Sequence, residues 1–443
     1  MITKSKFRLS SFQIIILGFL SLIIIGTILL MLPISTKTGR GAPFADALFT
    51  STSAVCVTGL VLHDTAMYWS AFGKFVIILL IQIGGMGVVT VYIIMSAVLE
   101  RKIGLRKRAI MQEAASASQI GGIVKFTYFI VNTVILSELL GALCLCPAFI
   151  KEYGFFKGVG YAIFHSVSAF CNAGFDLMGG KGEFSSLTSY NGSISVNLTL
   201  MALIIIGGLG FGTLEDIKRN KLEFKKYRLQ SKLILTTTFI LLVFPFLYFF
   251  FLEFNGEPLK ERVLMSAFQT VTPRTAGFNT ADLTKLSDSG VYILILLMLT
   301  GGATGSTAGG IKINTVAVLT TAAFSTFSRK KEATVFNRRI AVEIIHSAAA
   351  VFYIYLMAFV FSSIIISKIE GLPILSCMFE TASAVGTVGL SLGITAKLGI
   401  ISRCILMFLM FFGRVGGLTL IFAAVSKVGN VEAKLPLEAV SVG

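Results

Sequence analysis

The hydrophobic residues of the chain fall into eight long apolar runs. The runs cover residues 11–32, 75–98, 126–149, 196–214, 233–252, 291–311, 341–366 and 401–426. A helix of about 20 residues rises about 30 Å, which is the thickness of the hydrocarbon core of a membrane. The pattern therefore predicts an all-α polytopic membrane protein with eight spans.

A shorter apolar segment lies between the two members of each successive pair of runs. These segments are 43–54, 157–170, 259–271 and 372–384. Each has about 12–14 residues, a length that is typical of a re-entrant half-helix rather than a span. The chain therefore predicts four copies of one unit, in which a half-helix lies between two spans.

The four half-helices end in similar sequences. Each sequence has a glycine followed by leucine or phenylalanine, and the copies are 53–60, 168–175, 271–278 and 383–390. They recur about every 110 residues, which indicates a repeated structural unit. We expect four span–pore-helix–loop–span repeats around a pseudo-fourfold central pore. The expected repeats are 11–100, 126–219, 233–327 and 341–428, followed by a cytoplasmic C-terminal tail at 429–443.

The glycine loops have the chemistry of a filter for a dehydrated monovalent cation. Irregular backbone at membrane depth must be surrounded by protein or must line water. Rings of backbone carbonyls replace the hydration shell of potassium, and glycine permits the positive φ values that turn carbonyls inward. The fourth loop also opens like the Thr-Val-Gly-Tyr-Gly potassium filter. The predicted filter residues are Val57, Thr58, Gly59, Asn172, Ala173, Gly174, Thr275, Ala276, Gly277, Thr387, Val388 and Gly389.

Close helix packing is the alternative explanation for these glycines, and it is the better one for a single loop. Four loops in matched positions favour the filter. The matched positions contain no ring of acidic or basic residues, which disfavours divalent cations and anions. The third loop contains one charge, Arg274. We expect Arg274 either to anchor this loop to an acid such as Glu380 or to reach water.

A second glycine cluster lies in the second span of each unit. In the third unit, residues 301–310 are so rich in Gly, Ser and Thr that a helix cannot continue there. We expect an irregular intramembrane loop at 301–311, acting as a gate. In the other units the clusters around Gly84, Gly207 and Gly413 are expected to pack helices closely.

Two basic residues accompany this loop. Arg414 lies inside an apolar run, where a charge is costly and suggests function. We expect it to bond carbonyls or hydroxyls of loop 301–311, either as part of the gate or as a structural cap on broken backbone. Lys312 is either a second gate residue or a side chain that extends to the cytoplasm. The predicted gate residues are Gly301, Gly302, Thr304, Gly305, Ser306, Thr307, Gly309, Gly310, Lys312 and Arg414.

Composition and charge support a membrane location. The chain is 55% hydrophobic and 14% charged, whereas soluble proteins are about 25% charged. Most of the 38 lysines and arginines fall on one predicted side, which accounts for the net charge of +16 without nucleic acid. This distribution predicts a multi-pass protein of the cell membrane with both termini in the cytoplasm. The run 11–32 is too long for a signal peptide and is expected to remain as the first span.

Other classes of function are disfavoured. The six cysteines and three histidines lack the spacing of a transition-metal site. Ionisable groups within the apolar runs are scattered, so the sequence does not indicate an enzyme. The basic linkers are too short for a nucleotide-binding domain, so any such regulatory module is expected on another chain.

The four glycine loops, the broken second span of the third unit and Arg414 together resemble the membrane subunit of Ktr-type potassium transporters, in the Trk/Ktr/HKT superfamily. The resemblance covers nearly the whole chain from about residue 11. It implies a homodimer in which each chain encloses its own pore, on a cytosolic ring of regulatory subunits that bind ATP or ADP. It also implies uptake driven by membrane potential, often with sodium dependence, so Na⁺ is a possible second ion.

Within this resemblance, a serine at the first filter glycine accompanies sodium conduction in plant relatives. This chain has Gly59 there, which implies potassium selectivity. The third loop departs from the family pattern at Pro273 and Arg274. The expected function is potassium uptake through a carbonyl-lined filter, gated by loop 301–311 and a cytosolic subunit. The alternative is an alternating-access secondary cation transporter, since such folds also contain repeats with broken helices.

Overall fold

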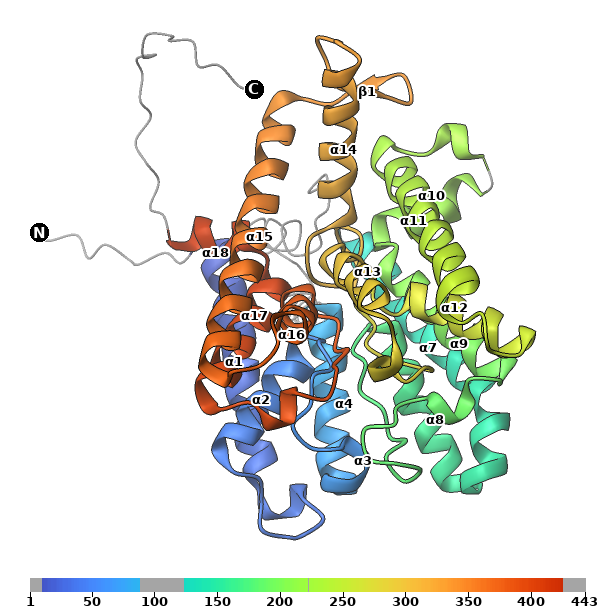
Figure 1. Cartoon of the computed structure of the whole chain (residues 1–443), viewed down its shortest axis with the longest axis vertical. Coiled ribbons are helices and arrows are strands. Elements are labelled where there is room, and N and C mark those ends of the chain that lie inside the picture. Colours follow the sequence, from blue (N-terminus) through green and yellow to red (C-terminus); the bar gives the residue numbers. More distant parts are fainter. Residues whose placement is uncertain (1–9, 88–122, 222, 425–443) are drawn as a thin grey trace, which may run out of the picture.

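The computed structural model describes residues 10–87, 123–221 and 223–424. The described chain is mostly helical, as expected for an all-α polytopic membrane protein (Figure 1). The end of the first expected repeat and the expected C-terminal tail lie outside the described residues.

Four groups of helices follow one another along the chain, each beginning with a long helix. The long helices are α1 (Ser11–Met31), α7 (Ile123–Tyr153), α11 (Leu229–Tyr248, continued by a π-helical turn at Phe249–Glu253) and α15 (Val342–Glu370). In each of the corresponding apolar segments, only 22–28% of the residues are buried. The remaining apolar surface faces outward, where lipid would cover it.

A half-helix follows each long helix. The half-helices are α2 (Phe44–Val55), α8 (Phe155–Phe170), α12 (Leu259–Val271) and α16 (Ile374–Gly386). Pro43, Pro258 and Pro373 directly precede α2, α12 and α16; proline suits a helix start because it fixes φ and has no N–H to satisfy. The last turns of all four half-helices are buried. Their partly negative C-terminal ends therefore lie inside the protein.

A third helix completes each group, and all of these helices are short. They are α4 (Ala71–Met86), α9 (Ile194–Gly208), α13 (Asp288–Leu299) and α17 (Ile400–Val415). Further helices are α3 (Thr65–Tyr68), α10 (Phe211–Asn220), α14 (Ile313–Phe327) and α18 (Gly417–Ala424). Strands β1 (Thr334–Val335) and β2 (Arg338–Arg339) form an antiparallel hairpin between α14 and α15.

A break was expected in only one of the eight spans, at 301–311, but helices also end within the apolar runs of the first, second and fourth units. The described residues contain four helices that are long and apolar enough to cross a membrane, or five if α9 and α10 count as one span bent by 99°. The short helices end at the glycine clusters, where Gly87, Gly210 and Gly416 have φ values of 84°, 82° and 93°. A backbone with positive φ leaves the α-helical region, so the helix stops there.

The packing expected for these clusters is also present. A Cβ atom at Gly84, Gly207 or Gly413 would overlap the carbonyl oxygen of Val55, Phe170 or Val385, respectively. Each of these carbonyls lies at the C-terminal end of a half-helix. The clusters therefore do two things: they allow the half-helix to approach closely, and they end the helix directly afterwards.

The four groups close into a ring. The short helix of each group contacts the half-helix of the next, in the pairs α4–α8, α9–α12, α13–α16 and α17–α2. The last pair joins the two ends of the chain, so the blue N-terminal elements and the red C-terminal elements lie side by side in Figure 1. The four loops after the half-helices consequently meet at the centre.

Candidate ion pathway

The four glycine loops have matching backbone conformations. The residue two positions before each glycine has a φ between 51° and 73°, and each glycine has a φ between 68° and 94°. The non-glycine residues are Val57, Asn172, Thr275 and Thr387. Left-handed backbone at such residues costs about 1–3 kcal/mol and persists only where the surroundings enforce it. The four turns are therefore held in an unusual shape by the protein around them.

A hydroxyl near the end of each half-helix fixes its loop. Ser53 and Ser383 accept the N–H of Gly59 and Gly389 at 3.1 and 3.0 Å. The Ser168 hydroxyl donates to the Phe175 carbonyl at 2.8 Å, and the Thr272 hydroxyl donates to the Phe278 carbonyl. These hydroxyls were not predicted from the sequence. The serine repeated at the same distance before three of the four glycines was the available signal.

The third loop differs locally from the others. The N–H before the glycine bonds a carbonyl five residues back in the other loops, from Thr58 to Ser53, for example. In the third loop, Ala276 N–H bonds the carbonyl of Thr272, four residues back. The hydroxyl of Thr272 also lies one position later than the serines. The departure at Pro273 and Arg274 therefore coincides with a shift of one residue in the bonding of this turn.

The four filter glycines form a closed ring of close contacts. A Cβ atom at Gly174 would lie 2.6 Å from the Ala276 carbonyl oxygen, and the other three glycines would meet the next loop even more closely. The contacts run from Gly59 to Ala173, from Gly174 to Ala276, from Gly277 to Val388 and from Gly389 to Thr58. No side chain fits at any of these four positions. All twelve predicted filter residues thus lie together at the junction of the four groups.

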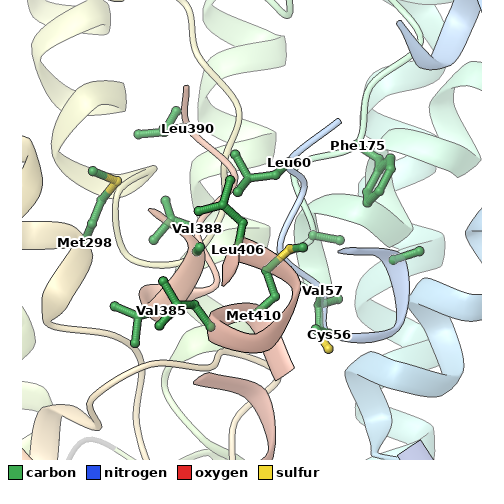
Figure 2. Packing of buried hydrophobic residues seen from close by; sticks show 14 of the residues in the cluster. Cys56, Val57, Leu60, Phe175, Met298, Val385, Val388, Leu390, Leu406 and Met410 are labelled. Atoms are coloured by element: carbon green, nitrogen blue, oxygen red, sulfur yellow. The ribbon is translucent and has the colours of Figure 1, made fainter. Parts of the chain in front are cut away.

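Apolar side chains beside the ring pack into the protein. Val57 and Val388 lie in one buried cluster with Val385, Met298 and Leu406 (Figure 2). These side chains come from the first, third and fourth groups. Their packing holds the loop backbones in place, so main-chain atoms rather than side chains are left to form the centre of the ring.

A cavity of about 280 Å³ opens on the ring, and all four filter glycines line it. Asp64, Asp176 and Asp282 line the same cavity. Burial, with the nearby charge of Asp64, raises the pKa of Asp176 to about 6. Negative charge in a concave site attracts cations. These carboxylates were not predicted from the sequence because they lie in the outer loops, beyond the glycine motif, although Asp64 and Asp282 each stand five residues after a filter glycine.

Loop 301–311 is an irregular segment closed at its base. Thr300 and Ile311 form a parallel bridge, and Gly301 N–H donates to the Ile311 carbonyl at 2.8 Å. The Thr307 hydroxyl lies 3.0 Å from the carbonyls of both Phe170 and Gly207, in the second group. The loop is therefore fixed at its ends and tied to α8 and α9.

The same loop packs against the fourth filter turn. A Cβ atom at Gly309 would overlap the side chain of Thr387, and one at Gly310 would lie 3.0 Å from the Gly386 carbonyl. Gly310 N–H also donates to the Gly413 carbonyl at 3.1 Å. In the middle of the loop, the Gly305 carbonyl accepts a hydrogen bond from Phe211 N–H at 2.9 Å. The loop thus lies between the filter and the helix breaks of the second and fourth groups.

Arg414 bonds the loop as expected. It donates from Nη1 to the Thr307 carbonyl, and from Nη2 to the carbonyls of Gly84 and, at 2.9 Å, of Gly85. One guanidinium therefore connects loop 301–311 with the end of α4. Lys312 donates to the Ala308 carbonyl at 2.7 Å, so its ammonium group turns back onto the loop. These bonds fit a gate residue and a structural cap equally well.

Both expectations for Arg274 were wrong. The side chain is only 4% exposed, so it does not reach water. It donates to the Thr238 hydroxyl of α11 at 3.3 Å. Glu380 instead accepts bonds from Ser391 and Leu392 at 2.7 and 3.0 Å, and from Thr395. The Glu380 carboxylate is therefore bonded by residues of its own group and not by Arg274 of the neighbouring group.

Comparisons with known proteins agree with this geometry. The model of the TrkH family, described as cation transport protein, matches residues 4–431. The potassium/sodium uptake protein NtpJ of Enterococcus hirae is 38% identical, over 98% of each chain. The Ktr system potassium uptake protein B of Bacillus subtilis is 39% identical, over 93% of this chain and 92% of that protein.

A solved structure shares the fold. The potassium transporter TrkH of Vibrio parahaemolyticus superposes with a TM-score of 0.76, covering 95% of this chain and 86% of that one. The identity is 18%, so the likeness lies in the arrangement of helices rather than in the sequence.

Proposed function

This chain belongs to the TrkH family of cation transport proteins, and from that premise we propose that it takes up potassium across the cell membrane through the ring of four glycine loops. It is a transport protein and not an enzyme. The observation that carries the proposal is the closed ring, in which each filter glycine meets the carbonyl of the next loop. Main-chain carbonyls gathered at one point can replace the water around a potassium ion.

Two relatives support the choice of ion. The Bacillus subtilis relative is named for potassium uptake, and the Enterococcus hirae relative for potassium and sodium. Potassium is therefore the proposed cargo. Sodium is a possible second ion, and the uptake is proposed to be sodium-dependent, as in a symporter.

The direction of transport follows from charge. The basic linkers support our proposal that both termini lie in the cytoplasm, by the positive-inside rule. The cavity lined by Asp64, Asp176 and Asp282 then faces outward and collects cations. A negative potential inside the cell favours entry by about 2.3 kcal/mol per charge for each 100 mV.

Loop 301–311 is the proposed gate. It lies against Thr387 on the inner side of the filter, and Arg414 holds it. A small displacement of the loop changes access to the filter without moving the ring. We propose that the gate residues are those of the loop, with Lys312 and Arg414.

Regulation is assigned to other chains. The relative from Bacillus subtilis is named as one protein of a Ktr system, which supports a partner. We propose a homodimer that sits on a cytosolic nucleotide-binding ring, with any nucleotide bound by that ring. The lipid bilayer is the remaining partner.

Alternating access remains the second candidate, and the helix breaks at the glycine clusters are the observation in its favour. The ring contacts favour the pore. In α4–α8, α9–α12, α13–α16 and α17–α2 the same two kinds of helix meet each time, so no half of the molecule is set apart to rock against the other.

Replacing Gly277 with serine tests the proposed filter. The new side chain would overlap the Val388 carbonyl and distort one quarter of the ring. We expect the preference for potassium over sodium to fall at least about tenfold, a loss of about 1.4 kcal/mol. The first measurement is ion flux in proteoliposomes. The second is growth rescue of a bacterium that lacks potassium uptake, with and without a candidate cytosolic subunit.

Gly371→Ser is the matched control. Gly371 also has a positive φ, of 65°, but a Cβ atom there would meet nothing within 4 Å. We expect the control to keep its ion preference. An unchanged preference in Gly277→Ser, at normal protein levels, would mean that the ring is not the filter.

A further inference from the structure

A strongly basic pocket lies at the end of the molecule where α11 begins. Its volume is about 640 Å³. Among the residues that the structure describes, its lining contains six cationic side chains and no acidic one. The cations are Lys225, Lys226, Arg228, Lys232, Arg338 and Arg339.

Two segments far apart in the sequence build this pocket. One is the turn that leads into α11, and the other is the β1–β2 hairpin at the same end of the molecule (Figure 1). The hairpin turns through Phe336 and Asn337, with φ values of 50° and 58°, as a two-residue turn of the primed type requires. The Phe336 ring packs edge-on to Phe224, with centroids 5.9 Å apart. The pocket is thus a formed feature and not a chance group of flexible side chains.

Three of the six cations have acidic partners. Arg228 bonds Asp216 at 2.8 Å, Lys226 bonds Glu223 at 2.6 Å, and Arg339 bonds Glu332 at 3.1 Å.

The other three cations are uncompensated within the described part of the chain. Lys225 and Arg338 have no acidic partner there, and Lys232 donates to the Lys225 carbonyl at 2.8 Å. The first turn of α11 also lacks a side-chain cap, so its partly positive N-terminus adds to the same field. Three like charges in one pocket repel one another unless an anion joins them.

The position of the pocket identifies the anion. Helix α11 opens the apolar segment Leu229–Glu253, which is long enough to span a membrane. Leu229 lines the pocket, so the pocket lies where the span meets the headgroups. Phe224 and Phe336 are 38% and 40% exposed beside the cations. Cations with exposed aromatic rings at this depth suit an anionic phospholipid.

We propose that this pocket binds the headgroup phosphate of an anionic phospholipid of the inner leaflet. Lys225, Lys232 and Arg338 hold the phosphate oxygens, and Phe224 and Phe336 pack against the apolar part of the lipid. The inference rests on the proposed function for its orientation, because it places the basic linkers on the cytoplasmic side.

Native mass spectrometry of the full chain in an uncharged detergent tests the proposal. The lipids are phosphatidylglycerol and phosphatidylcholine, and the pocket variant is Lys225→Gln with Arg338→Gln. Each basic residue near an anionic surface contributes about fivefold to affinity, so we expect the two changes to cause a loss of roughly thirtyfold for phosphatidylglycerol. Phosphatidylcholine binding stays the same in both proteins.

The matched control is Lys330→Gln with Lys331→Gln. These exposed lysines lie in the same linker as the hairpin but outside the pocket, and the change in net charge is identical. We expect the control to bind phosphatidylglycerol as the unaltered chain does. Arg338→Lys, which keeps the charge, should retain most of the binding. All variants should show the same elution volume and thermal midpoint.

Three results would overturn the proposal. One is full phosphatidylglycerol binding by the pocket variant. Another is displacement of the lipid by an equal concentration of inorganic phosphate, which would assign the pocket to the free ion. The third is a pocket variant that no longer binds a cytosolic partner protein but still binds the lipid, which would make the pocket a protein-docking surface. Potassium flux of the same proteins after reconstitution into proteoliposomes separates the two proposals: a chain that transports but binds no lipid contradicts only this one.

Discussion

The filter ring and loop 301–311 are both irregular backbone buried at the centre of the protein, but different contacts hold them. In the ring, backbone meets backbone, and each glycine leaves no room for a Cβ atom. The loop has backbone hydrogen bonds too, for example from Gly301 N–H to the Ile311 carbonyl, but side-chain bonds of Arg414 and Thr307 also join it to neighbouring groups. Its middle, Thr304 to Ser306, is only half-buried.

This difference separates a rigid part from a movable one. Backbone contacts in the ring can change only if a whole loop moves. Bonds from a side chain can be broken one at a time, and each contributes about 0.5–3 kcal/mol. A filter that must keep one geometry and a gate that must have two are therefore suited to these two kinds of contact. Both roles are proposals, and the following variants test the contrast from the largest expected effect to the smallest.

Gly389→Ala should have the largest effect. The new methyl group would overlap the Thr58 carbonyl, and alanine would also have to adopt a φ of 94°. Strain of this kind costs about 1–3 kcal/mol, so we expect the preference for potassium over sodium to fall roughly 5- to 150-fold. The measurement is competitive uptake of the two ions in proteoliposomes.

Gly393→Ala controls for backbone strain in that variant. Gly393 is in the same loop with a φ of 85°, but a Cβ atom there meets nothing within 4 Å. Similar losses in both variants would show that strain, and not the close contact within the ring, is responsible.

Arg414→Gln should release the loop and leave the ring intact. The change removes charged bonds to Thr307 and to the end of α4. We expect flux without the cytosolic partner to rise about tenfold or more, since bonds to a charged group contribute about 1.5–3 kcal/mol. The ratio of potassium to sodium should stay the same. Both are measured by isotope flux in proteoliposomes.

Arg403→Gln is the control on the same helix. Arg403 also bonds carbonyls, those of Leu398 and Ala396, but at the other end of α17. Its flux should be normal. A fall in selectivity without a rise in flux for Arg414→Gln would assign Arg414 to structural support and not to gating.

Ionisation of Asp176, in the cavity outside the ring, should have a smaller and pH-dependent effect on potassium uptake. The pKa of Asp176 is raised to about 6, so this carboxyl is ionised above that pH and neutral below it. Lowering the external pH from about 7.5 to about 5 should therefore reduce uptake at low potassium. A charge and an ion several ångströms apart in water attract each other by less than about 1 kcal/mol, so we expect a reduction of roughly twofold.

Asp176→Asn should remove this pH dependence. Asp282→Asn is the comparison, because the bond from Thr284 lowers the pKa of Asp282 and keeps it ionised over the same range. That variant should lower uptake equally at both pH values. A pH profile that is unchanged in Asp176→Asn would contradict the assignment.

Much of the architecture could be predicted from the sequence. The four half-helices were found within a few residues, and the break at 301–311 was placed correctly, because a run of glycines cannot remain helical. The other three breaks were missed. One residue at positive φ, such as Gly210, ends a helix without changing the apolar pattern around it.

The partners of single side chains were harder to predict. Arg414 was expected to meet the loop, and it does. Arg274 was expected to meet Glu380 or water, yet it lies against Thr238. A charge in an apolar run must find a polar partner, but which partner it finds depends on how neighbouring groups are rotated against one another.

The sequence by itself determined which segments are apolar, how long they are, and where glycine permits a turn. These are properties of short stretches of chain, since hydrophobicity and the missing Cβ atom act locally. Only the tertiary structure decided that Gly59 meets Ala173 and that Gly389 meets Thr58. Such contacts join residues more than a hundred positions apart, and they exist because each group of helices packs against the next and the last packs against the first.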